Sequence, residues 1–139
     1  MSALSEITQL KDLCLETILA SDGQARCKIV VPDGEGWAGL GAQVQGRIRE
    51  VSGATAEVVR AATVSEGDWR GFHLIVLGSM LNNAAIFRLY TNHYAFTDDA
   101  YPGEGGWEVR TIHNPFGHGR NVCCWGGVTW RGWRRRQES

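Results

Sequence analysis

The chain contains 139 residues, and its 14 Lys and Arg residues nearly balance its 15 Asp and Glu residues, which gives a formal net charge of −1. A charge so close to zero creates no overall field that would attract nucleic acid or a membrane surface, so we predict neither as a partner. The length fits one domain with a single core, and no apolar run approaches the ~20 residues that a membrane-spanning helix needs.

The first residues, Met-Ser-Ala-Leu-Ser-Glu, have neither the basic start nor the long apolar run of a signal peptide. We predict no signal peptide, and the location stays open with the cytoplasm as the default. Cys14 and Cys27 lie far apart and Cys123 and Cys124 are adjacent, so no pair has a C-x-x-C spacing. We therefore expect free or buried thiols in a reducing compartment, and neither a metal site nor a cofactor.

The N-terminal part predicts a short helix and a hairpin. Residues 5–14 carry apolar side chains at helical spacing and begin with a serine that can act as a cap. Two strand-like runs, residues 15–20 and 25–31, flank Ser-Asp-Gly-Gln at residues 21–24. Asp-Gly between two such runs is a strong hairpin signal because glycine tolerates positive φ.

A regular apolar stripe follows a glycine-rich loop. Its members are Leu40, Val44, Ile48 and Val51. Their spacing is typical of an amphipathic helix that lies on a sheet, and Gly53 is placed to end it.

The middle of the chain predicts the centre of the sheet. Residues 56–62 are expected to form a strand, and residues 65–71 a polar loop. Residues 72–77 are an apolar run too short for a buried helix, and Gly78 closes it. This pattern indicates a central strand that is buried on both faces.

A helix and another strand should follow. Asn82 or Asn83 can cap the helix, because a short amide oxygen accepts the free N–H groups of a first turn. One face of that helix is apolar: Ile86, Leu89 and Tyr90. Pro102 and three nearby glycines then break the chain before a strand at residues 107–112.

These elements predict an α/β (α+β layered) domain with a mixed sheet, an N-terminal hairpin and amphipathic helices packed on the sheet. In α/β folds the polar loop after a central strand is where ligands usually bind. The candidate ligand-binding residues near this loop are Asn82, Asn83, Asp98, Arg110 and His113. No nucleophile, base or metal cluster is evident there, so we predict no catalytic residues.

Residues 34–39 match G-x-G-x-x-G between a strand and a helix, which is the pattern of a dinucleotide-binding loop. Asp33 and Glu35 would place two carboxylates where phosphates should lie. The acidic residue expected at the end of the second strand is also misplaced, since Glu57 opens that strand. The pattern therefore favours a turn that leads into the amphipathic helix.

The histidines are not spaced as metal ligands. His73 lies within the buried-strand pattern, so we expect a core residue whose hydrogen bonds are satisfied. His93 ends a helix, where partial positive charge suits the dipole. His113 lies in a turn beside the strand ends and is the one histidine with a candidate functional role.

The composition changes at residue 123 to Cys-Cys-Trp-Gly-Gly-Val-Thr-Trp-Arg-Gly-Trp-Arg-Arg-Arg. Interleaved Trp and Arg fit a nucleic-acid or membrane-surface segment, but they are also what a GC-rich gene yields out of frame. Suitable codons, read one frame away, spell Leu-Leu-Gly-Gly-Ser-Asp-Val-Ala-Gly-Val-Ala-Ala-Ala. That frame predicts a strand, a glycine turn and an Ala-rich helix, so we favour a shifted or truncated reading frame for residues 123–139.

Several segments together resemble a known domain. They are a strand ending Ile-Val-Val-Pro, a helix ending Val-Ser-Gly, Leu-Ile-Val-Leu-Gly followed by Asn, and Gly-Gly-Trp-Glu-Val-Arg. This order resembles the small α/β domain that precedes the catalytic domain in hexosaminidase and α-glucuronidase types of glycoside hydrolase, and in some polysaccharide-degrading proteins such as lyases. The resemblance spans about residues 15–122, and the family's catalytic residues match no position here.

The resemblance implies a non-catalytic accessory domain at residues 1–122, with an atypical tail at residues 123–139. Its expected partners are the catalytic domain of a larger parent protein and an oligosaccharide. Two alternatives remain open: a nucleotide-binding domain that uses residues 34–39, and a small hydrolase that uses the loop around Asn82 with Asp98 and His113.

Overall fold

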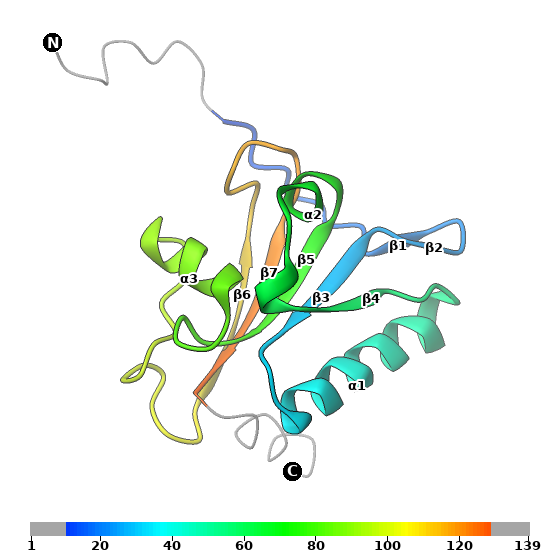
Figure 1. The fold of residues 1–139 in the computed structure, drawn as a ribbon. Helices are drawn as coiled ribbons and strands as arrows, with labels where there is room; N and C mark the ends of the chain where they lie inside the picture. The colour runs from blue at the N-terminus through cyan, green and yellow to red at the C-terminus, as the bar shows by residue number, and fades with distance from the viewer. Residues whose placement is uncertain (1–10, 129–139) are drawn as a thin grey trace, which may run out of the picture.

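The computed structural model describes residues 11–128, and a five-stranded mixed sheet forms its centre (Figure 1). The strand order is β4-β3-β5-β7-β6. The strands are β3 (Cys27–Val31), β4 (Glu57–Arg60), β5 (His73–Gly78), β6 (Trp107–Ile112) and β7 (Val122–Gly127). All neighbours pair in parallel except β6 and β7, which are antiparallel. The predicted α/β class with a mixed sheet is confirmed.

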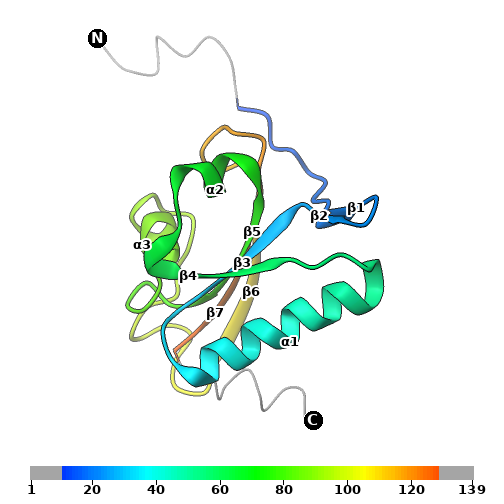
Figure 2. The same ribbon diagram turned by 45° about the vertical axis from the view of Figure 1, so that its right-hand side comes forward.

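Helices cover the two faces of the sheet unequally (Figures 1 and 2). The long helix α1 (Glu35–Ser52) lies on one face, and α2 (Glu66–Gly71) and α3 (Ala84–Thr91) lie on the other. None of the helices in the described part is long and apolar enough to cross a membrane.

The central strand β5 is buried along its whole length. Leu74 and Val76 point toward α2 and α3, whereas Ile75 and Leu77 point toward α1. This confirms the predicted two-sided strand, shifted by one residue. The sheet separates the apolar residues of α1 from those of α2 and α3 into two clusters.

The N-terminal hairpin is shorter than the sequence predicts. Its strands are β1 (Ala20–Ser21) and β2 (Gln24–Ala25), and Asp22 and Gly23 have φ values of 54° and 73°. Positive φ at both central residues is the requirement that makes Asp-Gly a hairpin signal, so the turn is confirmed. The second predicted strand is divided, because its larger part is β3 of the main sheet. The predicted helix at residues 5–14 lies mostly outside the described residues, and residues 11–14 are not helical.

Helix α1 begins earlier than predicted, at Glu35, so most of the glycine-rich loop belongs to the helix. Leu40 is buried, Val44 and Ile48 are partly buried, and Val51 is 72% exposed. The apolar stripe therefore ends one turn before the helix does. Gly53 ends α1 with a φ of 76°, as predicted.

The prediction of a polar loop at residues 65–71 is wrong, because most of this segment forms helix α2. Ser65 accepts a hydrogen bond from the Asp68 N–H, and the Asp68 carboxylate accepts one from the Ser65 N–H. This reciprocal cap satisfies two N–H groups of the first turn and stabilises a helix of only six residues. Lys28 on β3 donates to the same carboxylate at 2.7 Å, which fixes α2 to the sheet and lowers the pKa of Asp68.

Asn83 joins three elements at the carboxyl edge of the sheet. Its side-chain oxygen accepts from the Ala85 N–H and caps α3, as the sequence predicts. Its amide nitrogen donates to the carbonyl oxygens of Leu77 and Val30, at 2.8 and 3.3 Å, so it links the ends of β5 and β3. The side chain is buried, so water cannot replace these bonds.

Strand β7 carries the sheet beyond residue 122, where the sequence predicts the accessory domain to end. Cys124 and Gly126 are buried on the α3 side, and Trp125 lies on the α1 side. A Cβ atom at Gly126 would collide with the side chain of Thr97, so this position requires glycine. The first residues of the Trp- and Arg-rich segment are thus part of the sheet.

Asn83→Ala should lower the free energy of unfolding by about 2–4 kcal/mol, because it removes a helix cap and a buried side-chain donor to two carbonyl groups. Asn92→Ala is the control, since the Asn92 side chain is exposed and donates to one carbonyl, that of Arg88. It should cost less than about 0.5 kcal/mol. Urea unfolding of both variants measures the difference, and equal midpoints would contradict the linking role of Asn83.

Candidate functional site

The structure separates the five predicted ligand-binding residues into three places. Asn82 and Asn83 lie at the carboxyl edge of β5, and Asp98 and Arg110 line a neighbouring pocket. His113 follows β6 and lies at the opposite edge, where its Nδ1 is 3.4 Å from the Cys14 carbonyl oxygen. The grouping required for the hydrolase alternative is therefore not assembled, because His113 lies a strand length away from the carboxyl edge.

The two asparagines have structural roles. The Asn82 side-chain oxygen accepts from the Ser79 N–H at 2.8 Å, which closes the loop after β5. Gly78 makes this loop possible, with a φ of 111° and Pro32 and Asn82 packed where a Cβ atom would lie. With the bonds of Asn83 described above, most of the polar groups of this loop bond to one another. The amide groups of Asn82 and Asn83 at the carboxyl edge are therefore already used in hydrogen bonds within the protein.

The glycine motif lacks the geometry of a phosphate-binding loop. Asp33 forms an ion pair with Arg60 at 3.0 Å, which keeps a carboxylate beside the start of α1. Trp37 is buried in the first turns of the helix. In a dinucleotide fold the third glycine allows close helix–sheet packing. Here Gly39 has open space around it, and Gly41 is the residue that packs closely on Val31.

A pocket of about 660 Å³ lies between the end of α3, the segment that follows it and β6. Its lining residues are Tyr90, Thr91, His93, Ala95, Phe96, Asp98, Tyr101 and Arg110. The volume falls within the range of about 300–1,000 Å³ that is common for small-molecule sites. We call this cavity the aromatic pocket.

Asp98 is held as an anion at one side of the aromatic pocket. Its Oδ1 accepts from the N–H groups of Tyr101 and Ala100 at 2.8 and 2.9 Å, and its Oδ2 accepts from the Tyr90 hydroxyl at 3.0 Å. These bonds, with that from the Tyr101 N–H first, lower the pKa of Asp98. The same contact raises the pKa of Tyr90. Asp98 is thus an acceptor and is poorly suited to donate a proton as a general acid.

Arg110 provides donors at the other side of the aromatic pocket. Its guanidinium lies over the Phe96 ring, 4.7 Å from the ring centre, and Nη2 donates to Glu108 Oε2 at 3.3 Å. Glu108 also accepts from the hydroxyls of Thr97 and Tyr101, at 3.0 and 3.3 Å. Asp98, Glu108 and Arg110 are therefore each held by neighbouring contacts.

The described residues offer binding groups rather than a recognisable catalytic arrangement. Asp98 is the one carboxylate among the described residues that line the aromatic pocket. Within residues 11–128, no group of three His, Cys, Asp or Glu side chains is placed to hold a metal ion. Burial raises the pKa of Cys27 to about 11 and that of Cys124 to about 12, so neither thiol is a ready nucleophile at neutral pH.

Three aromatic members of the pocket, Tyr90, Phe96 and Tyr101, were not among the predicted site residues. A signal was available, since four of the twelve residues from 90 to 101 are aromatic. Phe96 and Tyr101 are 44% and 48% exposed. Exposed aromatic side chains gathered in one segment are unusual enough to suggest a binding role.

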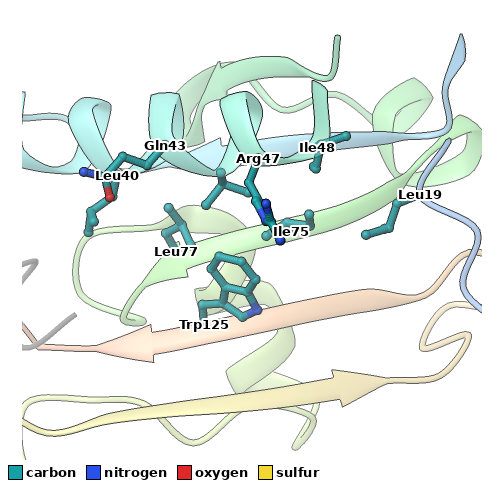
Figure 3. Close-up of a pocket in the computed structure, with 9 residues that line it drawn as sticks. Leu19, Leu40, Gln43, Arg47, Ile48, Ile75, Leu77 and Trp125 are labelled. Atoms are coloured by element: carbon teal, nitrogen blue, oxygen red, sulfur yellow. The ribbon is translucent and has the colours of Figure 1, made fainter. Parts of the chain in front are cut away.

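A second hollow, about 200 Å³ in volume, lies on the other face of the sheet (Figure 3). Leu40 and Arg47 of α1, Ile75 and Leu77 of β5 and Trp125 of β7 point into it. Its walls are mostly apolar side chains, and we call it the apolar groove. It lies at the border between the part of the sheet that α1 covers and the part formed by β7 and β6.

Comparisons with known proteins add no assignment to these sites. No protein-family model matches the chain, and no curated protein matches it.

His73 is a buried histidine with satisfied hydrogen-bonding, as the sequence predicts. Its Nδ1 accepts from the Asn121 N–H at 2.9 Å, so this nitrogen carries no proton. Burial and the nearby Arg120 lower the pKa of His73. Protonation would turn Nδ1 into a donor and break the bond to Asn121.

The pKa of His73 makes stability depend on pH. Because the folded pKa is lower than the unfolded value of about 6.5, the unfolded chain binds more protons below that pH, and stability is lost as the pH falls. This residue should therefore contribute a progressive loss of stability as the pH falls from 7.5 to 5.5. His73→Gln, which keeps an acceptor, should flatten this part of the profile in urea unfolding. Equal slopes for both proteins would contradict the assignment.

Proposed function

We propose that this chain is a non-catalytic accessory α/β domain of a glycan-degrading protein, either a glycoside hydrolase or a polysaccharide lyase, and that it works packed against the rest of that parent protein. The order of segments that resembles such domains supports the glycan-degrading part. The proposed packing against the parent protein is supported by one structural observation: half of the sheet beside the apolar groove is exposed.

The exposed half is formed by β6 and β7 on the α1 side. Val109 pairs with Trp125 across the two strands, so both side chains lie on this face. Val109 is 49% exposed, Thr111 is exposed, and Trp125 is partly exposed. In the described part of the chain, α1 lies over β3, β4 and the nearer side of β5 and does not extend across this surface (Figure 2).

Sheets built mostly of parallel strands are normally covered on both faces, because their strands are apolar on both sides. Among the described residues, the α2 and α3 face meets this requirement, and the α1 face meets it as far as the apolar groove. Exposed apolar surface of this kind supports packing against another protein element.

We assign this place to an amphipathic helix of the parent protein that follows β7. Strand β7 ends at Gly127 beside the open face, so a short turn would bring the next element onto it. With suitable codons, another reading frame of this region would spell a glycine turn and an Ala-rich helix, and small side chains allow a helix to approach a sheet closely. Neither the nucleotide-binding nor the hydrolase alternative is favoured by a specific feature of the sites.

The isolated chain should self-associate through the open face. Val109→Lys should shift it toward monomer in sedimentation velocity, because a charge on this face opposes burial. Val51→Lys adds the same charge on α1 at a position that is 72% exposed, and it should leave association unchanged. The proposal would be contradicted if the unsubstituted chain were strictly monomeric, or if the two variants had equal effects on association.

The gene offers an independent test. Translation of the other two frames across residues 121–139 should reveal a long open frame that begins Leu-Leu-Gly-Gly-Ser-Asp, continues as a helix and leads to a catalytic domain for glycans. Immediate stop codons in both frames would contradict the shifted-frame hypothesis. A continuation without a carbohydrate-active domain would leave the packing surface in place and remove the glycan-degrading assignment.

A further inference from the structure

We propose that the aromatic pocket binds a neutral saccharide. This inference goes beyond the proposed function, because it assigns a ligand to a different face of the sheet from the apolar groove. It follows from the hydrogen-bonding groups, the exposed rings and the charges that the pocket brings together.

The pocket retains several hydrogen-bond acceptors after its internal bonds are formed. Asp98 Oδ2 accepts one bond, from Tyr90, and a carboxylate oxygen has room for a second. The hydroxyls of Tyr90 and Tyr101 donate to Asp98 and Glu108, so each oxygen keeps a lone pair for a ligand donor. These positions suit hydroxyl groups that donate.

Arg110 supplies donors in the same cavity. A guanidinium has five N–H groups, and one of the Arg110 groups bonds Glu108. The side chain is 40% exposed, so its outer N–H groups can reach a ligand. A sugar hydroxyl both donates and accepts, and a ring with several hydroxyls can therefore use Arg110 and Asp98 together.

The charges favour a neutral ligand. Asp98 and Arg110 line the pocket with opposite charges, and Asp99 and Glu108 lie close to it in the chain or in space. A phosphate or carboxylate would be repelled by the acidic groups, while a cation would meet Arg110. A neutral molecule rich in hydroxyls encounters neither penalty.

The exposed rings supply the apolar contact that a sugar ring needs. Phe96 and Tyr101 present large exposed ring surfaces, and saccharide rings have C–H faces that can pack on them. Tyr101 is already ordered, because its N–H and its hydroxyl both bond to carboxylates. Little side-chain freedom is lost on binding, and this ordering favours affinity.

The test is isothermal titration calorimetry of the full chain with cellobiose, N,N′-diacetylchitobiose, glucuronic acid and AMP. At least one neutral disaccharide should bind with a Kd on the order of 1 mM. Tyr101→Ala and Arg110→Gln should each weaken binding about tenfold, the effect expected from losing one good contact. Phe96→Ala should weaken it as well, whereas Phe87→Ala is the matched control, with an exposed ring outside the pocket.

Amide chemical shifts provide a second readout that does not depend on any variant folding. Saccharide should move the signals of residues 90–101 and of Arg110, and leave those of α1 in place. Absence of binding by both neutral disaccharides, tighter binding of glucuronic acid or AMP, or equal affinity of the Phe96 and Phe87 variants would overturn the inference. Val109→Lys should keep saccharide binding, so failure of the pocket and failure of the packing surface are distinguishable.

Discussion

The two-sided burial of β5 is the constraint on which the rest of the structure depends. A strand with parallel neighbours on both sides and apolar residues on both faces must be covered by helices above and below. Asn83 ties the end of this strand to β3 and starts α3, so one side chain fixes the junction at which the cover of the second face begins. Within residues 11–128, the first face is covered by α1, and this cover ends at the apolar groove.

This constraint also explains where hydrogen-bonding groups are available to a ligand. The loop after β5 is the usual ligand position in an α/β fold, yet its polar groups are used to join β3, β5 and α3. Open donors and acceptors lie to the side, where α3 and β6 meet. The sequence predicted Asp98, Arg110 and His113 as candidates near the loop after β5, but it could not show that the first two line a separate pocket and that His113 lies at the far edge. That depends on β6 running antiparallel to its neighbour.

The fold was predictable where local signals and burial agree. The apolar run of β5, the Asn83 cap and Gly53 after α1 each have one good structural solution. Helix α2 was missed because its six residues include Gly67 and Gly71 and have no apolar period, although the Ser65–Asp68 cap was readable in the sequence. β7 was difficult for another reason: the Trp- and Arg-rich composition hides a strand whose position is set by pairing with β5 and β6.

Position 125 shows how the sheet tolerates this unusual strand. The hypothetical shifted frame, Leu-Leu-Gly-Gly from position 123, would place glycine at positions 125 and 126. Glycine at 126 suits the close approach of Thr97 in either frame, so the α3 side of β7 does not distinguish them. The α1 side does, because Trp125 projects beside Leu77 into the apolar groove and its indole N–H donates to Cys123 Sγ. Glycine at 125 would leave that space to a helix. A single indole fills part of the groove but cannot reach across β6, and Val109 therefore remains exposed.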